Sequence, residues 1–270
     1  LKGIAEPEQK RKIIGRTFVE VFEKSLREIK GRAEFLGQGT LYPDVIESVS
    51  IGNNPASLIK THHNRVERIQ ELIAEGRVLE PLAEFYKDEV RVLGRALGLP
   101  KALVDRHPFP GPALAIRCLC SAKEAKPEDA PQIDVLSKAS GYRAMLLPLH
   151  SVGVQGDSRS YAKLTVLYGK PLDYRVLLPL ATKITNKFRE TNRVALVLAP
   201  KRLRPSEWKI RRATLTPKRV MLLQQADRIV TEFLREHGLY KRVWQCPVVL
   251  VPFARNGGET IALRPVTSVD

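Results

Sequence analysis

Three polar segments of the chain combine residue types that bind phosphates or metal ions. The first is the glycine loop Gly37-Gln38-Gly39-Thr40, followed a few residues later by Asp44 and Glu47. Spaced three positions apart, the two carboxylates would lie on one face of a helix. Carboxylate oxygens suit Mg²⁺, which commonly neutralises triphosphate charge. The pattern indicates a nucleotide and magnesium site, and a solvated acidic helix face is the alternative that it leaves open.

The second segment is Lys60-Thr61-His62-His63-Asn64, which follows the glycine- and asparagine-rich stretch 52–55. A loop of this composition that carries a lysine and two histidines suits a lid that closes over phosphates. A polar surface loop is the alternative. Adjacent histidines in a strand point in different directions, so we expect no zinc site on this pair alone.

The third segment runs from Leu149 to Arg159 and contains two glycines together with Gln155, Asp157 and Arg159. Backbone amides and a guanidinium at the end of a strand can bind a phosphate or a purine edge. A simple turn with an Asp–Arg pair fits the spacing equally well.

Positive charge is concentrated in the second half of the chain. The 270 residues carry a net charge of +16, with 19 basic and 16 acidic side chains in residues 1–120 and 26 basic and 13 acidic ones in residues 121–270. Such a field attracts polyanions or small phosphorylated ligands. The densest basic cluster, at 201–212, contains only one aromatic residue, Trp208. Since base stacking needs aromatic side chains, we expect nucleic acid to be an unlikely partner and leave a solvated loop or a partner surface open.

The elements that must position these segments can be read from hydrophobic periodicity. In the first half it predicts helices at 8–30, 65–75 and 84–97, a short helix at 43–48, and buried strands at 35–36 and 78–79. Helices that alternate with short buried strands indicate an α/β layer domain. In the second half, strands at 144–149, 164–167, 194–199 and 248–252 and helices at 173–190 and 217–236 indicate an α+β domain.

Proline-bearing segments separate the two halves. Residues 107–113 contain three prolines and one glycine, which predicts a rigid connection, and the polar stretch 121–131 is consistent with a linker. Cys118 and Cys120 would share one face of a strand as small core residues. No apolar run approaches the roughly 20 residues that cross a bilayer, and the first residues lack the apolar core of a secretion signal, so we expect no membrane association and a cytosolic location.

Several motifs together resemble the glutamine-hydrolysing GMP synthase family. They occur in the family's order within residues 7–161 and read PEQKRKIIG, FLGQGTLYPDVIES, LIKTHHN, VLEPL, FYKDEVRVLGRALGLP, HPFPGPALAIR and LHSVGVQGDSRSY. The remainder, which includes the stretches around Gln245 and Arg264, resembles the family's C-terminal dimerisation domain more loosely. The resemblance implies part of an ATP pyrophosphatase domain, of the adenine-nucleotide alpha-hydrolase-like α/β type, at 1–120 and an α+β dimerisation and substrate-binding domain at 121–270.

The family resemblance also implies a reaction. An ATP-dependent carbon–nitrogen ligase of this kind uses ATP and Mg²⁺ to adenylate xanthosine monophosphate (XMP), and ammonia from a glutamine amidotransferase domain or subunit then displaces AMP to give GMP. A homodimer is implied. By motif match, Asp44 and Glu47 would serve adenylation, and residues 60–64 would form the lid near the ATP loop 37–40. Lys60, His62 and His63 of this lid are expected to be catalytic as well. The residues expected at the XMP pocket are Arg11, Asp157, Arg159, Gln245 and Arg264.

The sequence also departs from the family pattern. The phosphate-binding motif Ser-Gly-Gly-Val-Asp-Ser and the amidotransferase cysteine do not occur in these 270 residues, and Ala113 stands where the family usually has glycine. We therefore expect a fragment of the enzyme. A non-catalytic descendant that binds nucleotide or RNA, or that only dimerises, is the alternative from a different functional class, and another ATP pyrophosphatase with a different acceptor is a weaker one.

Overall fold

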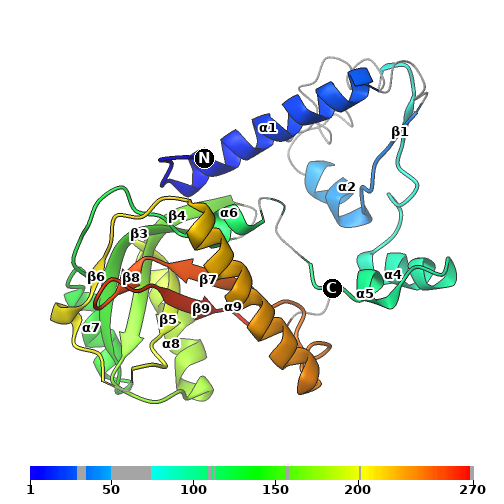
Figure 1. The fold of residues 1–270 in the computed structure, drawn as a ribbon. Coiled ribbons are helices and arrows are strands. Elements are labelled where there is room, and N and C mark those ends of the chain that lie inside the picture. Colours follow the sequence, from blue (N-terminus) through cyan, green and yellow to red (C-terminus); the bar gives the residue numbers. More distant parts are fainter. Residues whose placement is uncertain are drawn as a thin grey trace. The chain divides into compact units, whose positions relative to one another are not determined.

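The computed structural model describes residues 1–28, 35–49, 74–108, 111, 113–155, 158–200 and 202–267. These residues form a mixed α/β protein with small sheets, and they divide into two compact units (Figure 1). One unit combines Leu1–Arg11 with Phe109–Val266, and the other consists chiefly of Lys12–Pro108. This division reflects spatial compactness alone, and the domain boundary predicted after residue 120 stays a prediction.

The smaller unit carries the glycine loop between a short sheet and a short helix. Strand β1 (Leu36–Gly37) pairs in parallel with β2 (Val78–Leu79), and helix α2 (Tyr42–Val49) follows the loop. Helices α4 (Lys87–Ala96) and α5 (Lys101–Val104) complete the described part of this unit. Helix α4 stops at Gly98, whose φ of 75° favours glycine. These elements confirm the helices at 43–48 and 84–97 and the positions of the two predicted strands, but the strands are not buried, since Phe35 and Leu79 are exposed. Most of the predicted helix at 65–75 lies outside the described residues.

Helix α1 (Pro7–Glu28) confirms the predicted helix at 8–30 over its described length. Its first residues, up to Arg11, belong to the larger unit, and the residues from Lys12 onward belong to the smaller one. A single helix is therefore shared by both units.

A three-stranded sheet forms the centre of the larger unit. Strand β4 (Ser158–Tyr168) lies between β3 (Arg143–Gln155), to which it is antiparallel, and β5 (Thr191–Leu196), to which it is parallel. The register of β3 shifts between Leu147 and His150, where Pro148 has no N–H to donate to the ladder. Strands β3 and β4 are thus much longer than the predicted runs at 144–149 and 164–167.

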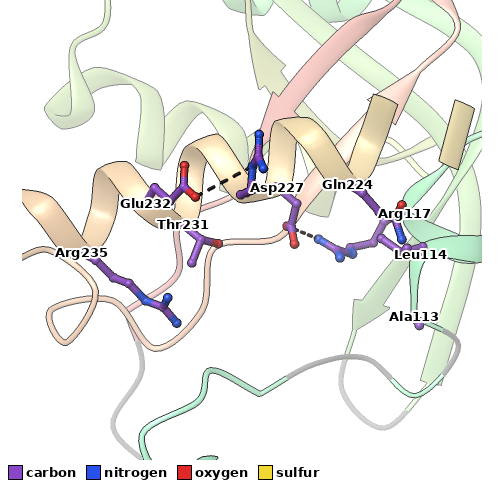
Figure 2. Close-up of a pocket in the computed structure, with 9 residues that line it drawn as sticks. Ala113, Leu114, Arg117, Gln224, Asp227, Thr231, Glu232 and Arg235 are labelled. Atoms are coloured by element: carbon purple, nitrogen blue, oxygen red, sulfur yellow. Dashed lines mark hydrogen bonds and ion pairs between the residues drawn. The ribbon is translucent and has the colours of Figure 1, made fainter. Parts of the chain in front are cut away.

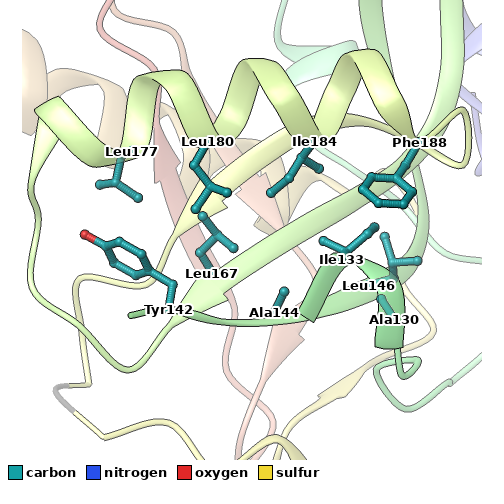
Figure 3. Close-up of a cluster of buried hydrophobic side chains, with 10 residues drawn as sticks. All are labelled: Ala130, Ile133, Tyr142, Ala144, Leu146, Leu167, Leu177, Leu180, Ile184 and Phe188. Carbon is teal, nitrogen blue, oxygen red and sulfur yellow. The ribbon is translucent and has the colours of Figure 1, made fainter. Parts of the chain in front are cut away.

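Helices α7 (Pro131–Lys138) and α8 (Tyr174–Lys187) supply the apolar side chains that cover one face of this sheet (Figure 3). The buried cluster there consists of Ala130, Ile133, Tyr142, Ala144, Leu146, Leu167, Leu177, Leu180, Ile184 and Phe188. Residues 144 and 146 lie on this side and residues 145 and 147 lie on the other, as the two-residue period of a strand requires.

Two small sheets and helix α9 (Pro217–Glu236) complete the larger unit. Strand β6 (Lys209–Ile210) pairs with β8 (Phe253–Ala254), and β7 (Val248–Val251) pairs with β9 (Thr260–Leu263). Buried residues of β6, β7 and β8 pack on the second face of the central sheet. Helix α9 has the predicted bounds, because Thr216 caps its first turn and Pro217 occupies its first position. Short helix α6 (Leu114–Arg117) lies against α9 and β7.

The interpretation of 121–131 as a linker is wrong. Isolated β-bridges join Ser121 to Ala213, Ala125 to Ile210, and Glu128 to Leu146. The segment is therefore held along the larger unit at three points. The polar composition of the segment indicated a linker, and its bridging partners could not be recognised because they lie far away in the sequence.

The expectation that Cys118 and Cys120 are small core residues is confirmed, since they are 0% and 7% exposed. Both thiols are buried, but they follow helix α6, and only Cys118 forms a bridge, to Leu250. In addition, the Cys120 sulfur accepts hydrogen bonds from the cationic side chains of Lys10 and Arg219.

Candidate functional site

The glycine loop is held at both ends by backbone and side-chain hydrogen bonds. The amide of Gln38 donates to the Leu79 carbonyl at 2.8 Å, which extends the β1–β2 pairing into the loop. The hydroxyl of Thr40 donates to the carboxylate of Glu80. A Cβ added at Gly37 or Gly39 would meet nothing within 4 Å, so the loop has open space on this side.

Asp44 lies in the first turn of α2, directly after the glycine loop. Its Oδ2 accepts a hydrogen bond from the Leu41 amide at 2.9 Å, which satisfies a donor at the helix start. Glu47 is on the same helix, but its side chain lies outside the described part. A carboxylate is a hard oxygen donor that fits Mg²⁺, yet no cluster of three or more His, Cys, Asp or Glu side chains is found among the described residues.

The predicted lid residues Lys60, Thr61, His62, His63 and Asn64 lie outside the described residues. Their role in closing over phosphates stays a prediction.

The start of helix α1 is anchored in the larger unit by a buried lysine. Lys10, only 2% exposed, donates from Nζ to the carbonyls of Ala115 (3.2 Å) and Cys118 (2.9 Å) and to the sulfur of Cys120 (3.0 Å). One turn earlier, Glu6 pairs with His150 of β3 at 3.0 Å. These contacts fix the backbone beside the half-buried Arg11, which was predicted to contact XMP.

A second cation also approaches the Cys120 sulfur. Arg219 of α9 forms a buried two-pronged ion pair with Glu259, with Nε–Oε1 and Nη2–Oε2 distances of 2.7 Å. Its Nη1 lies 3.5 Å from the Cys120 sulfur. The hydrogen bond with Cys118, together with Lys10 and Arg219, lowers the pKa of Cys120 to about 5 despite burial, whereas the pKa of Cys118 is raised. The two cations thus favour the thiolate form of Cys120.

The predicted nucleotide-binding hairpin is formed by the far ends of β3 and β4. Gln155 pairs with Ser158, so only Gly156 and Asp157 connect the two strands. Asp157 lies outside the described residues. Arg159 lies in β4, where its backbone pairs with Val154 of β3, but its side chain is not described.

Gln245 and Arg264 lie in neighbouring backbone segments of the larger unit. Gln245 forms an isolated bridge with Val266, and the Arg264 amide donates to the Pro247 carbonyl at 3.1 Å. The side chain of Arg264 keeps solvent contact, yet surrounding protein atoms lower its pKa. Burial, with the nearby charge of Arg264, also lowers the pKa of Arg193 to about 10. Two cations thus approach each other here, an arrangement that an anion would stabilise.

A separate surface pocket between α6 and α9 contains none of the predicted site residues (Figure 2). Arg117 pairs there with Asp227 at 2.6 Å, and Arg228 pairs with Glu232 at 3.9 Å. Arg235 lies over the ring of Tyr240. These cations therefore already have protein partners.

The structure thus places Arg11, Gln245, Arg264 and the hairpin strands in one compact unit, and the glycine loop and Asp44 in the other. Sequence reasoning missed Lys10, Cys120, Arg193 and Arg219. Lysine and cysteine side chains 110 positions apart give no periodic signal, so only the fold brings them together.

These features define a mixed α/β protein with candidate phosphate-binding residues in each unit. No family model matches the chain. Curated relatives do: a probable glutamine-hydrolysing GMP synthase of Leptospira interrogans is 44% identical over 99% of this chain and 45% of its own length. Glutamine-hydrolysing GMP synthases of Rhodopseudomonas palustris and Sinorhizobium fredii are 46% and 45% identical, each over 77% of this chain and 42% and 44% of their own lengths.

By sequence, the chain is homologous to one part of the glutamine-hydrolysing GMP synthases. It spans about 45% of the length of the Leptospira relative. Among the described residues, no helix is long and apolar enough to cross a bilayer.

Proposed function

We propose that this chain supplies the XMP- and ATP-binding part of a glutamine-hydrolysing GMP synthase, a cytosolic ATP-dependent ligase. The observation that supports this most is the 44% identity over 99% of the chain to a protein of that name. The placement of Arg11, Gln245 and Arg264 in one compact unit agrees with a shared substrate pocket. We assign residues 1–120 to the ATP pyrophosphatase domain and 121–270 to the dimerisation domain of a homodimer.

In the proposed reaction, the C2 oxygen of XMP attacks the α-phosphorus of ATP, and pyrophosphate leaves. Ammonia, delivered by an amidotransferase domain or subunit, then attacks C2 and AMP leaves, which gives GMP. Because the nucleophile and leaving groups belong to the substrates, the protein mainly positions them and neutralises charge.

The side chains divide this work between the two substrates. The cationic side chains of Arg11, Arg159 and Arg264 would hold the XMP phosphate. Asp157 would accept hydrogen bonds from the purine, and Gln245 would exchange hydrogen bonds with it. The loop 37–40 and the lid 60–64 would surround the triphosphate. Asp44 and Glu47 would hold Mg²⁺, which neutralises triphosphate charge when it is bound.

Calorimetric titration of the chain with XMP tests the pocket directly. We expect measurable binding that weakens about tenfold or more in Arg11→Ala and in Asp157→Ala, because each loses a charge-assisted hydrogen bond. Arg16→Ala is the matched control, since Arg16 lies on the same helix but is exposed and pairs with Glu20. Absence of heat with the unmodified chain, or equal affinity in all variants, would contradict the assignment.

The alternative of a non-catalytic RNA-binding or dimerisation protein is not favoured by the relatives, which are all named as enzymes. The form of this alternative that binds only RNA makes an opposite prediction in the same assay: the chain would bind single-stranded RNA and not XMP.

A further inference from the structure

The side-chain nitrogen of Lys10 and the sulfur of Cys120 lie 3.0 Å apart inside the larger unit. The two side chains come from residues that are 2% and 7% exposed. The lysine ammonium has three hydrogens to donate, and the carbonyls of Ala115 and Cys118 accept alongside the sulfur. The nitrogen is therefore held in place beside the sulfur.

Arg219 approaches the same sulfur with a guanidinium that is itself fixed. Its Nη1 lies 3.5 Å from the Cys120 sulfur, its Nη2 donates to the Leu119 carbonyl at 2.8 Å, and Glu259 binds it through two oxygens. Two cations thus face one sulfur and favour its thiolate form. The thiolate is the form of cysteine that reacts as a nucleophile.

We propose that Lys10 and Cys120 form an oxidative modification site, at which a peroxide joins Nζ and Sγ through a sulfenamide cross-link. Neither residue has a role in the proposed ligase reaction, so this inference is independent of that function.

The first step is oxidation of the sulfur by hydrogen peroxide. The Cys120 thiolate attacks one peroxide oxygen, so an S–O bond forms and the O–O bond breaks. The departing hydroxide takes a proton from Lys10, which gives water, a sulfenic acid at Cys120 and a neutral amine at Lys10. Sulfur loses two electrons and the peroxide oxygens gain them. Local opening of the native chain admits a molecule as small as peroxide.

The second step is condensation of the sulfenic acid with the neighbouring amine. The Lys10 nitrogen attacks the sulfur, an S–N bond forms, and the S–O bond breaks. The oxygen leaves as water with a proton from the amine. Overall, a thiolate, an ammonium and a peroxide give a sulfenamide and two water molecules. Sulfenic acids condense with nitrogen in this way.

Cys118 is the competing partner, because a sulfenic acid also condenses with a thiol to form a disulfide. The hydrogen bond with Cys120, together with burial, raises the pKa of the Cys118 thiol, which favours its protonated form. A protonated thiol is a poor nucleophile. Its backbone is also fixed by a bridge to Leu250. The Lys10 nitrogen, already 3.0 Å from the sulfur, is therefore the favoured partner.

The main test treats the native full chain with hydrogen peroxide, digests it with trypsin and measures peptide masses. We expect residues 3–11 joined to residues 118–123, with a mass two hydrogens below the sum of the two peptides. Trypsin does not cleave after a modified lysine, so the bond between Lys10 and Arg11 stays uncut. The peroxide dose is one that converts the exposed Met221 to its sulfoxide in the same digest.

Three outcomes of this digest would overturn the inference. They are a disulfide between Cys118 and Cys120, a sulfinic acid at Cys120 without the linked peptides, and an unmodified Cys120 beside oxidised Met221. Because the main test uses the unmodified sequence, it does not depend on the folding of any variant.

Two substitutions form a matched pair for the same digest. Cys118→Ser removes the competing thiol, and we expect the cross-link to form as before. Lys10→Arg keeps the positive charge but has no primary amine, so we expect the linked peptides to be lost. Loss of the cross-link in Cys118→Ser would contradict the assignment, since it would show that Cys118 takes part in the linkage.

Thermal unfolding gives a second readout. A bond between positions 110 residues apart closes a long loop in the unfolded chain and so stabilises the folded one. We expect the unfolding midpoint after treatment to rise by about 5 °C or more relative to Lys10→Arg treated in the same way. A thiol reductant cleaves the S–N bond and should reverse the rise. A midpoint that does not rise, or a rise that the reductant leaves in place, would contradict a sulfenamide. Neither measurement involves XMP, so a negative result here would leave the proposed function intact.

Discussion

At the scale of single residues, the buried contact between Lys10 and Cys120 explains how α1 is attached to the larger unit. An ammonium that is 2% exposed needs a nearby negative charge, because an isolated buried charge is costly. Glu259 already pairs with Arg219, which leaves the Cys120 sulfur as the anion facing Lys10. We therefore predict that the Cys120 thiolate acts as the counter-ion of Lys10.

This counter-ion makes stability depend on pH. The pKa of Cys120 is lowered from 9.0 to about 5 in the folded chain, so the thiolate contributes nothing below pH 5, and its contribution grows as pH rises and is complete above pH 9. We expect the free energy of unfolding to increase by up to about 1.4 kcal/mol for each pH unit inside that window. Above pH 9 it should decline, because the raised pKa of Cys118 keeps that thiol protonated when folded. Urea unfolding across this range measures both trends.

Thiolate ultraviolet absorbance provides an independent check in the native chain. Cys120→Ser serves as the blank, since it removes the titrating sulfur and retains a small polar group. Native protein that shows no Cys120-dependent absorbance at neutral pH would mean that Lys10 faces a neutral thiol.

At the scale of elements, the segment 121–131 behaves as part of the larger unit's hydrogen-bond network. Each of its bridges is reciprocal: Ser121 and Ala213 exchange two backbone bonds of 2.9 Å, and Ala125 and Ile210 exchange bonds of 3.0 and 2.8 Å. Its partners belong to strands or loops more than 15 residues away, so its order depends on the folded unit.

Hydrogen exchange should show this order directly. We expect the amides of Ser121, Ala125 and Glu128 to exchange on the order of 100-fold more slowly than the amide of Lys126. Lys126 is the internal control, since its amide forms no hydrogen bond within the described part of the chain. Equally fast exchange at all four positions would restore the interpretation as a linker.

Some elements could be predicted from local sequence signals such as helix caps. Others depend on pairing between strands that lie far apart in the sequence, which the sequence alone does not show. Helix α9 was predicted to the residue because Thr216 and Pro217 start it and Gly238 follows it. Strand β3 was predicted only from 144 to 149, since its continuation is rich in glycine and polar residues and reads as a turn. That continuation is a strand because β4 pairs with it and Asn192 holds it, which periodicity cannot reveal.

At the scale of the whole molecule, the net charge of +16 should make nucleotide affinity depend on salt. We expect XMP binding to weaken about threefold between roughly 50 mM and roughly 300 mM salt, because mobile ions screen the attraction of the cationic unit for the phosphate. Xanthosine, which lacks the phosphate, is the control ligand and should show little dependence. Equal salt sensitivity for both ligands would indicate that the phosphate does not meet this field.

The candidate site was partly predictable at this scale. Motifs predict Arg11, Gln245 and Arg264 as site residues, and the fold places these three residues in one compact unit, although Arg11 lies more than 230 residues from the other two. The supporting residues Lys10, Asn192 and Arg193 were not identified, since their function depends on which backbone carbonyls the fold brings near them.

The sharing of helix α1 between both units limits how the gene can be dissected. Neither unit is a continuous stretch of sequence, so no single cut separates them. A piece that starts at Phe109 would lack Lys10, and with it the hydrogen bonds to the carbonyls of Ala115 and Cys118 and to the Cys120 sulfur. To obtain the larger unit in isolation, residues 1–11 should therefore be supplied as a separate peptide or fused ahead of Phe109.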